Sequence, residues 1–126
     1  MSKLKILIVE DEDVTQKLYA ISFRDEKYDL RFADNGEEAI TTYKSWQPDI
    51  IILDIIMPNM NGFQTLEVIR TKMQDLSTTV VMASAVSDKK EILACAQLGI
   101  QGYILKPFST KELAVTVLKY HNKTKK

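Results

Sequence analysis

The sequence predicts an α/β protein, a doubly wound parallel sheet of five strands sandwiched between two layers of helices. Five short apolar stretches alternate along the chain with five stretches in which apolar residues recur every three or four positions. Such alternation with short connections is typical of βαβ units, because parallel strands need helical crossovers. Several apolar stretches are continuous rather than alternating, as expected of strands that helices cover on both faces.

The expected strands are residues 4–9, 29–33, 49–54, 79–84 and 101–105. The first, third and fourth of these are almost entirely apolar and rich in Ile, Leu and Val. In the flavodoxin-like strand order 2-1-3-4-5, the first and third strands are neighbours. They then flank the switch point, where open α/β sheets bind their ligands.

The expected helices follow from apolar residues at helical spacing. These residues are Val14, Leu18 and Ile21; Ala39, Ile40 and Tyr43; Leu66, Ile69 and Met73; Ile92, Ala96 and Leu98; and Leu113, Val117 and Tyr120. Asp13 is the expected N-cap of the first helix and Ser109 or Thr110 that of the last, because short polar side chains accept hydrogen bonds from free backbone N–H groups. Gly99 is well placed to end the fourth helix.

Length and composition indicate one globular domain at residues 1–121, followed by a basic C-terminal tail at residues 122–126. The 17 basic and 17 acidic side chains balance, so no net field favours nucleic acid or an anionic membrane. The single cysteine, Cys95, excludes an internal disulfide and suits a reducing, cytoplasmic compartment; we interpret it as a small buried residue of a helix. No apolar run reaches the ~18 residues of a membrane span, and the early first strand leaves no room for a signal peptide.

Polar side chains stand where the apolar runs end: Glu10 and Asp11 after the first, Asp54 at the third, Ser84 at the fourth and Lys106 after the fifth. Because the carboxyl ends of parallel strands meet at one edge of a sheet, we expect these side chains to lie together. Three carboxylates there would repel one another unless a cation is present, and hard oxygen ligands favour Mg²⁺. The lysine and the hydroxyl can bind anionic oxygens, so the set predicts a phosphoryl-transfer site with a carboxylate nucleophile.

The motifs that carry these residues resemble the signature set of response-regulator receiver domains. They are ILIVEDE at 6–12, LDIIMPNMNG at 53–62, Ser84-Ala85 and Lys106-Pro107-Phe108. The separations of 30 residues from Asp54 to Ser84 and 22 from Ser84 to Lys106 also resemble those of the family. The resemblance covers essentially the whole chain.

The resemblance implies that Asp54 accepts a phosphoryl group from a phosphohistidine of a sensor histidine kinase or a phosphotransfer protein, in a two-component phosphorelay. Asp11, Asp54 and the backbone carbonyl of Ile56 would bind Mg²⁺, and Glu10 would act largely through water. Lys106 would pair with the aspartyl phosphate.

A conformational switch is also implied by the resemblance. Ser84 would swing toward the phosphoryl group and Tyr103 would change rotamer with it, remodelling the face formed by the fourth helix, the fifth strand and the fifth helix. A downstream effector protein, or a second copy of the chain, would dock there, near Ile92, Cys95, Tyr103 and the helix at 111–119. The chain is then a switch that catalyses its own phosphorylation and dephosphorylation rather than a dedicated enzyme, with no direct contact to nucleic acid or membrane.

Three features depart from the commonest pattern of the family. Glu10 stands where Asp is more usual, and Ser84 stands where Thr is frequent. Ile56 and Val86, each two residues past a site residue, are apolar at positions that tune phosphoryl lifetime in the family. We expect them to limit access of water and lengthen the phosphorylated state. The resemblance also implies that the bond between Lys106 and the proline after it is cis, an isomer that needs proline.

Other functions are compatible with parts of the sequence. The run Asp11-Glu12-Asp13-Val14-Thr15 resembles the Asp-x-Asp-x-Thr motif of haloacid-dehalogenase-like phosphatases, with Asp11 as nucleophile, although only Glu112 follows Lys106 where that family has an acidic pair. A pseudo-receiver that keeps the fold without the chemistry is a second alternative. A mononucleotide binder is less favoured, because acids after the first strand would repel phosphate.

Overall fold

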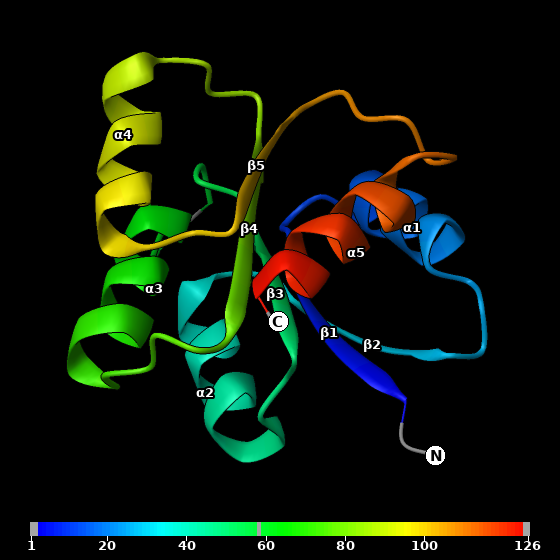
Figure 1. Ribbon diagram of the computed structural model, residues 1–126, viewed down its shortest axis with the longest axis horizontal. Helices are drawn as coiled ribbons and strands as arrows, with labels where there is room; N and C mark the ends of the chain where they lie inside the picture. Colours follow the sequence, from blue (N-terminus) through cyan, green and yellow to red (C-terminus); the bar gives the residue numbers. More distant parts are fainter. Residues whose placement is uncertain (1–2, 58, 125–126) are drawn as a thin grey trace.

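A computed structural model describes residues 3–57 and 59–124 of the chain (Figure 1). Within this part, five parallel strands form one sheet in the order β2-β1-β3-β4-β5. They are β1 (Leu4–Val9), β2 (Tyr28–Ala33), β3 (Ile50–Leu53), β4 (Thr79–Ser84) and β5 (Gly102–Leu105). The predicted fold class and strand order are confirmed, whereas Pro58 and the last two residues of the predicted tail, Lys125 and Lys126, lie outside the described residues.

The register of the strands aligns their carboxyl ends at one edge. Val9 of β1 pairs with Leu53 of β3, so the acids that follow these two residues are neighbours. Ser84 of β4 pairs with Leu105 of β5, which brings the following residue, Lys106, to the same edge.

Helices cover both faces of the sheet (Figure 1). They are α1 (Asp13–Ser22), α2 (Gly36–Trp46), α3 (Gly62–Glu67), the π-helix η1 (Val68–Lys72), α4 (Lys89–Leu98) and α5 (Leu113–Thr124). The strand side chains that point to α2, α3 and α4 include Leu7, Val9, Ile51, Leu53, Val80 and Met82, all buried. Those that point to α1 and α5 include Ile6, Ile8, Ile50 and Ile52, also buried. The continuous apolar runs therefore supply both halves of the core.

The apolar stripe of α1 faces solvent, contrary to the usual reading of a helical period. Val14 is 71% exposed and Ile21 52% exposed. The core beneath α1 is filled instead by Tyr19, whose ring lies 4.9 Å from that of Phe108, and by Phe23. Two aromatic rings bury more apolar area than the aliphatic stripe could, so the helix turns them inward.

The helix ends differ slightly from the predicted ones. Glu12 occupies the N-cap position of α1 and Asp13 is the first helical residue, because the Glu12 carbonyl accepts the first helical hydrogen bond. Gly99 ends α4 as predicted, at φ 106°, a conformation that favours glycine. The carbonyl of Ser109 accepts the N–H of Leu113 at the start of α5, and this helix runs through Thr124, three residues past the predicted domain boundary at 121.

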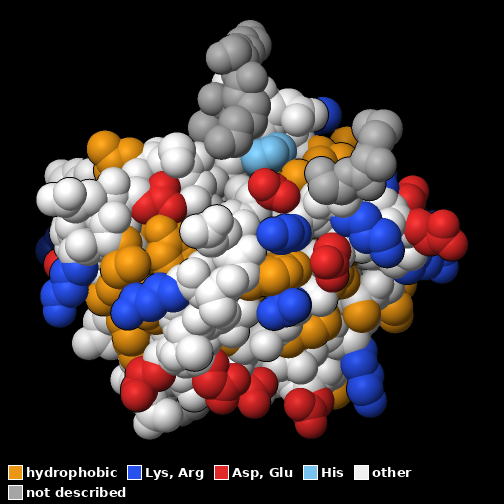
Figure 2. Space-filling view, turned by 90° about the horizontal axis from the view of Figure 1, so that it is seen from below, with side chains coloured by type: hydrophobic (Ala, Val, Ile, Leu, Met, Phe, Trp, Pro, Cys, Tyr) orange, Lys and Arg blue, Asp and Glu red, His pale blue; other side chains and the backbone are white. Residues whose placement is uncertain are grey.

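The surface matches a chain with no net charge. On the face in Figure 2, acidic, basic and apolar side chains are interspersed. None of the helices in the described ranges combines the length and the apolar character that a bilayer-spanning segment needs.

Candidate functional site

Three carboxylates gather where β1 and β3 end. Glu10 is fully buried and Asp54 is 8% exposed, whereas Asp11 is exposed. One oxygen from each of the three lies within 4.8 Å of those of the other two. The predicted cluster is therefore formed, and no other group of three or more potential metal-binding side chains occurs in the described ranges.

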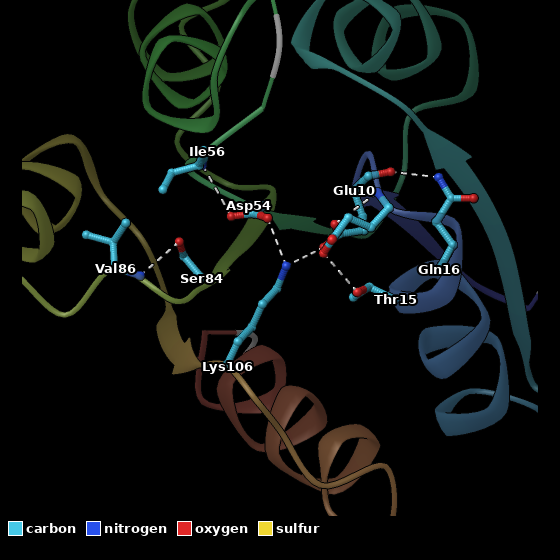
Figure 3. Close-up of polar contacts among 9 residues, drawn as sticks. Glu10, Thr15, Gln16, Asp54, Ile56, Ser84, Val86 and Lys106 are labelled. Carbon is cyan, nitrogen blue, oxygen red and sulfur yellow. Dashed lines mark hydrogen bonds and ion pairs between the residues drawn. The ribbon is translucent and has the colours of Figure 1, made fainter.

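Lys106 reaches these acids from the end of β5 (Figure 3). Its Nζ is 2.8 Å from Oδ2 of Asp54 and 2.5 Å from Oε1 of Glu10. Burial alone would lower the pKa of Lys106, but the hydrogen bonds to Asp54 and Glu10 outweigh it and raise the pKa above its usual value. The side chain is thus held as a cation between two anions.

Glu10 is held by contacts to each of its carboxylate oxygens. Oε1 accepts from Lys106, and Oε2 accepts the backbone N–H of Glu12 at 3.2 Å. Burial nevertheless raises the pKa of Glu10, and the charge of Lys106 offsets only part of that rise.

The backbone of the loop after β3 contacts Asp54. The backbone N–H of Ile56 donates to Oδ1 of Asp54 at 3.3 Å. Gly62, at the start of α3, lies so close that a Cβ there would be 2.0 Å from the Asp54 carbonyl oxygen, so only glycine fits. Ile56 itself is 66% exposed at the rim.

A chain of hydrogen bonds links β4 to β5 beside the acids. Ser84 is fully buried, and its Oγ accepts the N–H of Val86 at 3.2 Å. The hydroxyl of Tyr103 donates to the Val86 carbonyl at 2.7 Å. Ser84 and Tyr103, the two predicted switch residues, thus both hold the loop after β4 by hydrogen bonds to the backbone of Val86. The sequence did not indicate that Val86 links them.

An open pocket of about 310 Å³ gives access to Asp54. Its lining residues are Asp11, Glu12, Asp54, Ile56, Ser84, Ala85 and Lys106. The pocket brings together every predicted catalytic side chain. Tyr103 and Glu10 are not among its lining residues, although Lys106, which lines it, contacts Glu10.

The chemistry of this donor set suits a hard divalent cation. Carboxylate oxygens are the ligands that Mg²⁺ prefers, and an open position leaves room for water or a phosphoryl oxygen. Three acids against one lysine also leave a net negative charge, which a cation would balance. The residues present therefore fit a metal site.

Sequence reasoning missed one contact of the site and placed another residue too near the surface. The amide of Gln16 on α1 donates to the Glu10 carbonyl at 2.6 Å, and no pattern distinguishes such a glutamine from a solvated one. Cys95 is fully buried, as its residue type suggested, so it lies beneath the expected docking face rather than on it. The predicted cis bond between Lys106 and Pro107 is confirmed.

Comparison with known proteins agrees with the geometry. The family described as "Response regulator receiver domain" matches residues 6–118. The chain belongs to the response-regulator receiver domain family. The phosphatase and pseudo-receiver alternatives are accordingly not favoured.

Relatives of this receiver domain include longer regulators. The "DNA-binding response regulator MtrA" of Mycolicibacterium smegmatis is 31% identical over 113 residues, which are 90% of this chain and 48% of the relative. The "Probable transcriptional regulator ycf27" of Guillardia theta is 33% identical over 125 residues, or 99% and 48% of the two chains. The receiver domain thus spans about half the length of the curated relatives it matches.

Solved receiver structures share the fold. The signal receiver domain of a putative Luxo repressor protein from Vibrio parahaemolyticus superposes with a TM-score of 0.88 at 28% identity, covering 98% of this chain and 93% of the other. The chemotaxis response regulator CheY4 of Vibrio cholerae gives 0.86 at 25% identity, covering 94% and 99%.

Proposed function

We propose that Asp54 is the phosphoacceptor of this receiver domain and that the donor is a phosphohistidine on a sensor histidine kinase or a phosphotransfer protein. The observation that carries this proposal is the contact of Lys106 with Asp54, which lines an open pocket and clusters with the carboxylates of Glu10 and Asp11. An oxygen of Asp54 attacks phosphorus, a P–O bond forms, and the P–N bond breaks with its electron pair on the imidazole nitrogen. The other ring nitrogen of the donor carries a proton, so the ring leaves as neutral imidazole and remains on the donor protein.

The acids would hold Mg²⁺ in this reaction. Asp11 and Asp54 would bind the metal directly together with the backbone carbonyl of Ile56, and Glu10 would act largely through water. The ion would supply positive charge for the phosphoryl oxygens. Lys106 would neutralise the same oxygens from the opposite side, which would hold the phosphoryl group against the Asp54 carboxylate.

The signal would leave through Ser84 and Tyr103. A phosphoryl group on Asp54 adds charge and acceptor oxygens, toward which the Ser84 hydroxyl turns. That movement removes the acceptor of the Val86 N–H, so the loop after β4 and the Tyr103 hydroxyl on the Val86 carbonyl rearrange together. The α4-β5-α5 face changes in consequence.

Exposed apolar side chains suit that face for docking. Leu93 of α4, Leu105 of β5 and Val115 of α5 are each at least half exposed. We assign this face to a downstream effector protein, with a homodimer as the alternative. Direct binding of nucleic acid or membrane by this domain is not expected, since its net charge is zero. The single cysteine and the membership of this family support a cytoplasmic location.

The donor would meet α1. The stripe of Val14, Leu18 and Ile21 is exposed beside the acidic turn that follows β1. An apolar helical face of this kind suits packing against a helix of the donor, which would bring its phosphohistidine to Asp54.

The test is labelling of Asp54. Wild-type protein incubated with acetyl phosphate and Mg²⁺ should carry the phosphoryl group on the peptide that contains Asp54, and Asp54→Asn should carry none. Asp13→Asn, which removes an exposed acid from the first turn of α1, is the matched control and should label normally. Persistent stoichiometric labelling of Asp54→Asn would refute the assignment, and label on Asp11 would favour the phosphatase chemistry.

A further inference from the structure

Gln16 reaches from α1 back to the turn that carries the acids. Its Nε2 donates to the carbonyl oxygen of Glu10 at 2.6 Å, a contact drawn in Figure 3, and to Oδ1 of Asp34 at 3.0 Å. The residue is half-buried. Nothing in the proposed phosphotransfer uses this side chain, yet one amide group joins β1, α1 and the loop before α2.

The carbonyl that Gln16 holds belongs to the peptide that links Glu10 to Asp11. The N–H of Glu10 donates to the Ala33 carbonyl at 3.0 Å, and its carboxylate is held by Lys106. Glu10 is therefore fixed through its side chain and both backbone groups. Asp11 is exposed, so the direction of its carboxylate depends on the plane of that peptide.

The far end of the Gln16 amide is anchored as well. The N–H of Asp34 donates to Oε1 of Glu38 at 3.1 Å, and Asn35 caps α2 by accepting the Glu38 N–H at 3.0 Å. Asp34 is thus part of a capped helix start, and its carboxylate gives Gln16 a fixed partner. Because the amide is neutral, it holds the turn without bringing a competing cation to the acids.

We infer that Gln16 is a positioning residue for the metal site, which fixes the Glu10–Asp11 peptide so that the Asp11 carboxylate points at Mg²⁺. The inference rests on the metal site of the proposed function. Partners that orient metal ligands from behind change metal affinity by about 10–100-fold when they are removed. Because the Gln16 amide donates to a backbone carbonyl and to Asp34, it should act on Mg²⁺ affinity more than on the chemical step.

The test compares Mg²⁺ affinity in Gln16→Met, which keeps the length of the side chain and removes both donors. Isothermal titration calorimetry should show about tenfold weaker Mg²⁺ binding than in the wild type. Labelling by acetyl phosphate should need correspondingly more Mg²⁺ for half its maximal rate, whereas the rate at saturating Mg²⁺ should change little. A purely structural role would also lower the labelling rate at saturating Mg²⁺.

Two controls sharpen the comparison. Lys17→Met alters the exposed neighbour on α1 and should leave Mg²⁺ affinity unchanged. Asp34→Asn keeps an acceptor oxygen for the amide and should also bind Mg²⁺ as the wild type does. Asp34→Leu removes that acceptor and should weaken binding, though less than Gln16→Met.

Wild-type Mg²⁺ affinity in folded Gln16→Met would overturn the inference. If that variant does not fold, Gln16→Leu removes both donors without adding a charge, and unchanged affinity there would overturn it equally. A wild type that binds Mg²⁺ but never labels at Asp54 would refute the proposed function and leave the role of Gln16 standing. A wild type that binds no Mg²⁺ would refute the inference itself.

Discussion

In the pocket, the ammonium group of Lys106 forms ion pairs with two carboxylates. Nζ of Lys106 contacts both Glu10 and Asp54, and Glu10 has no exposed surface. Removing one member of a buried ion pair costs about 3–5 kcal/mol, because the other charge is left uncompensated. Lys106 is therefore a structural partner of Glu10 as well as a partner of the phosphoacceptor, and these two roles constrain the same side chain.

At the pocket rim, apolar residues should set the lifetime of the phosphorylated state. Ile56 is 66% exposed and lines the pocket, and Val86 is half-buried and donates its N–H to Oγ of Ser84, which also lines the pocket. We expect Ile56→Asn and Val86→Glu each to speed autodephosphorylation severalfold, because a polar side chain there can orient an attacking water. The measurement is the decay of label on Asp54 after the donor is removed. Leu93→Asn, on the exposed side of α4, should decay as the wild type does; unchanged decay in both rim variants would disprove the idea.

Among the elements, α1 has one face packed beside the pocket residues and another exposed for docking. Inward, Tyr19 packs on Phe108, two residues past Lys106, and burial followed by the charges of Glu10 and Asp54 raises the pKa of the Tyr19 phenol. Outward, the stripe of Val14, Leu18 and Ile21 is open. The helix therefore carries the exposed stripe on one face and the contact with Phe108, close to Lys106 in the chain, on the other.

Substitution on the outer face of α1 should separate docking from chemistry. Val14→Arg should change the free energy of unfolding by less than about 0.5 kcal/mol, as exposed substitutions usually do. Labelling by acetyl phosphate should stay at the wild-type rate, whereas phosphotransfer from the cognate histidine kinase should fall at least tenfold. Leu76→Arg is the matched control, since Leu76 is 73% exposed in the loop before β4. Equal phosphotransfer to both variants would remove α1 from the docking surface.

The junction of η1 with β4 is fastened by a buried arginine. Nε of Arg70 donates to the Gly99 carbonyl, and its Nη groups donate to the carbonyls of Asp75 and Thr78 and to Oε1 of Gln101, at 2.8–3.2 Å. The π-helical turn carries Arg70 to this position, 5% exposed. The carboxyl end of α4 is thereby tied to the loop before β4, at the end of the sheet opposite the pocket.

At this junction, Asp75 should contribute a pH-dependent part of the free energy of unfolding. Partial burial alone would raise the pKa of Asp75, but hydrogen bonds from Thr78, Tyr43 and Ser77 outweigh it and hold the pKa well below its usual 3.8. The unfolded chain therefore binds more protons just below that value, so the stabilisation is complete above about pH 3.8 and is lost as the pH falls toward the folded-state pKa.

Asp75→Asn should lower the free energy of unfolding by about 1.5–3 kcal/mol at pH 7, the usual contribution of hydrogen bonds to a charged group. The difference from the wild type should shrink steadily in denaturant titrations below about pH 3.8. Asp29→Asn, an exposed acid on β2, controls for the loss of a charge. A difference independent of pH would contradict this account.

For the molecule as a whole, the site and the fold are coupled through charge. Three acids at one edge of the sheet repel one another in metal-free buffer, and a bound cation relieves that repulsion. A ligand that binds only the folded chain stabilises it by about 2.7 kcal/mol at one hundred times its Kd.

Mg²⁺ should accordingly raise the Tm of the whole domain, and a chelator should reverse the effect. Thermal unfolding followed by circular dichroism over a Mg²⁺ series measures it. Asp11→Asn should lose most of the shift, whereas Asp13→Asn should keep it. A wild-type Tm that does not respond to Mg²⁺ would argue against the metal site.

The pocket and most of the sheet could be predicted because β1, β3, β4 and β5 are mostly apolar runs, and at the end of each run stands a polar side chain of the site. In these strands the strand boundary and the site residue are one signal, whereas Asp29 and Arg31 interrupt β2. The orientation of α1 could not be predicted in this way, since Tyr19 and the stripe through Leu18 are both apolar and only packing decides which turns inward. Gln16 gave no signal either, because a hydrogen bond to a backbone carbonyl six residues away leaves no trace in residue pattern.

The burial of Cys95 gives the domain a clean background for chemical labelling. The only thiol of the chain has no accessible surface, and burial raises its pKa, so the native protein should not react with maleimides or nitroxide reagents. A cysteine introduced at an exposed position such as Leu93 would then carry a single spin label or dye. The spectrum of that probe before and after acetyl phosphate treatment would follow α4 alone, in an otherwise unmodified receiver domain.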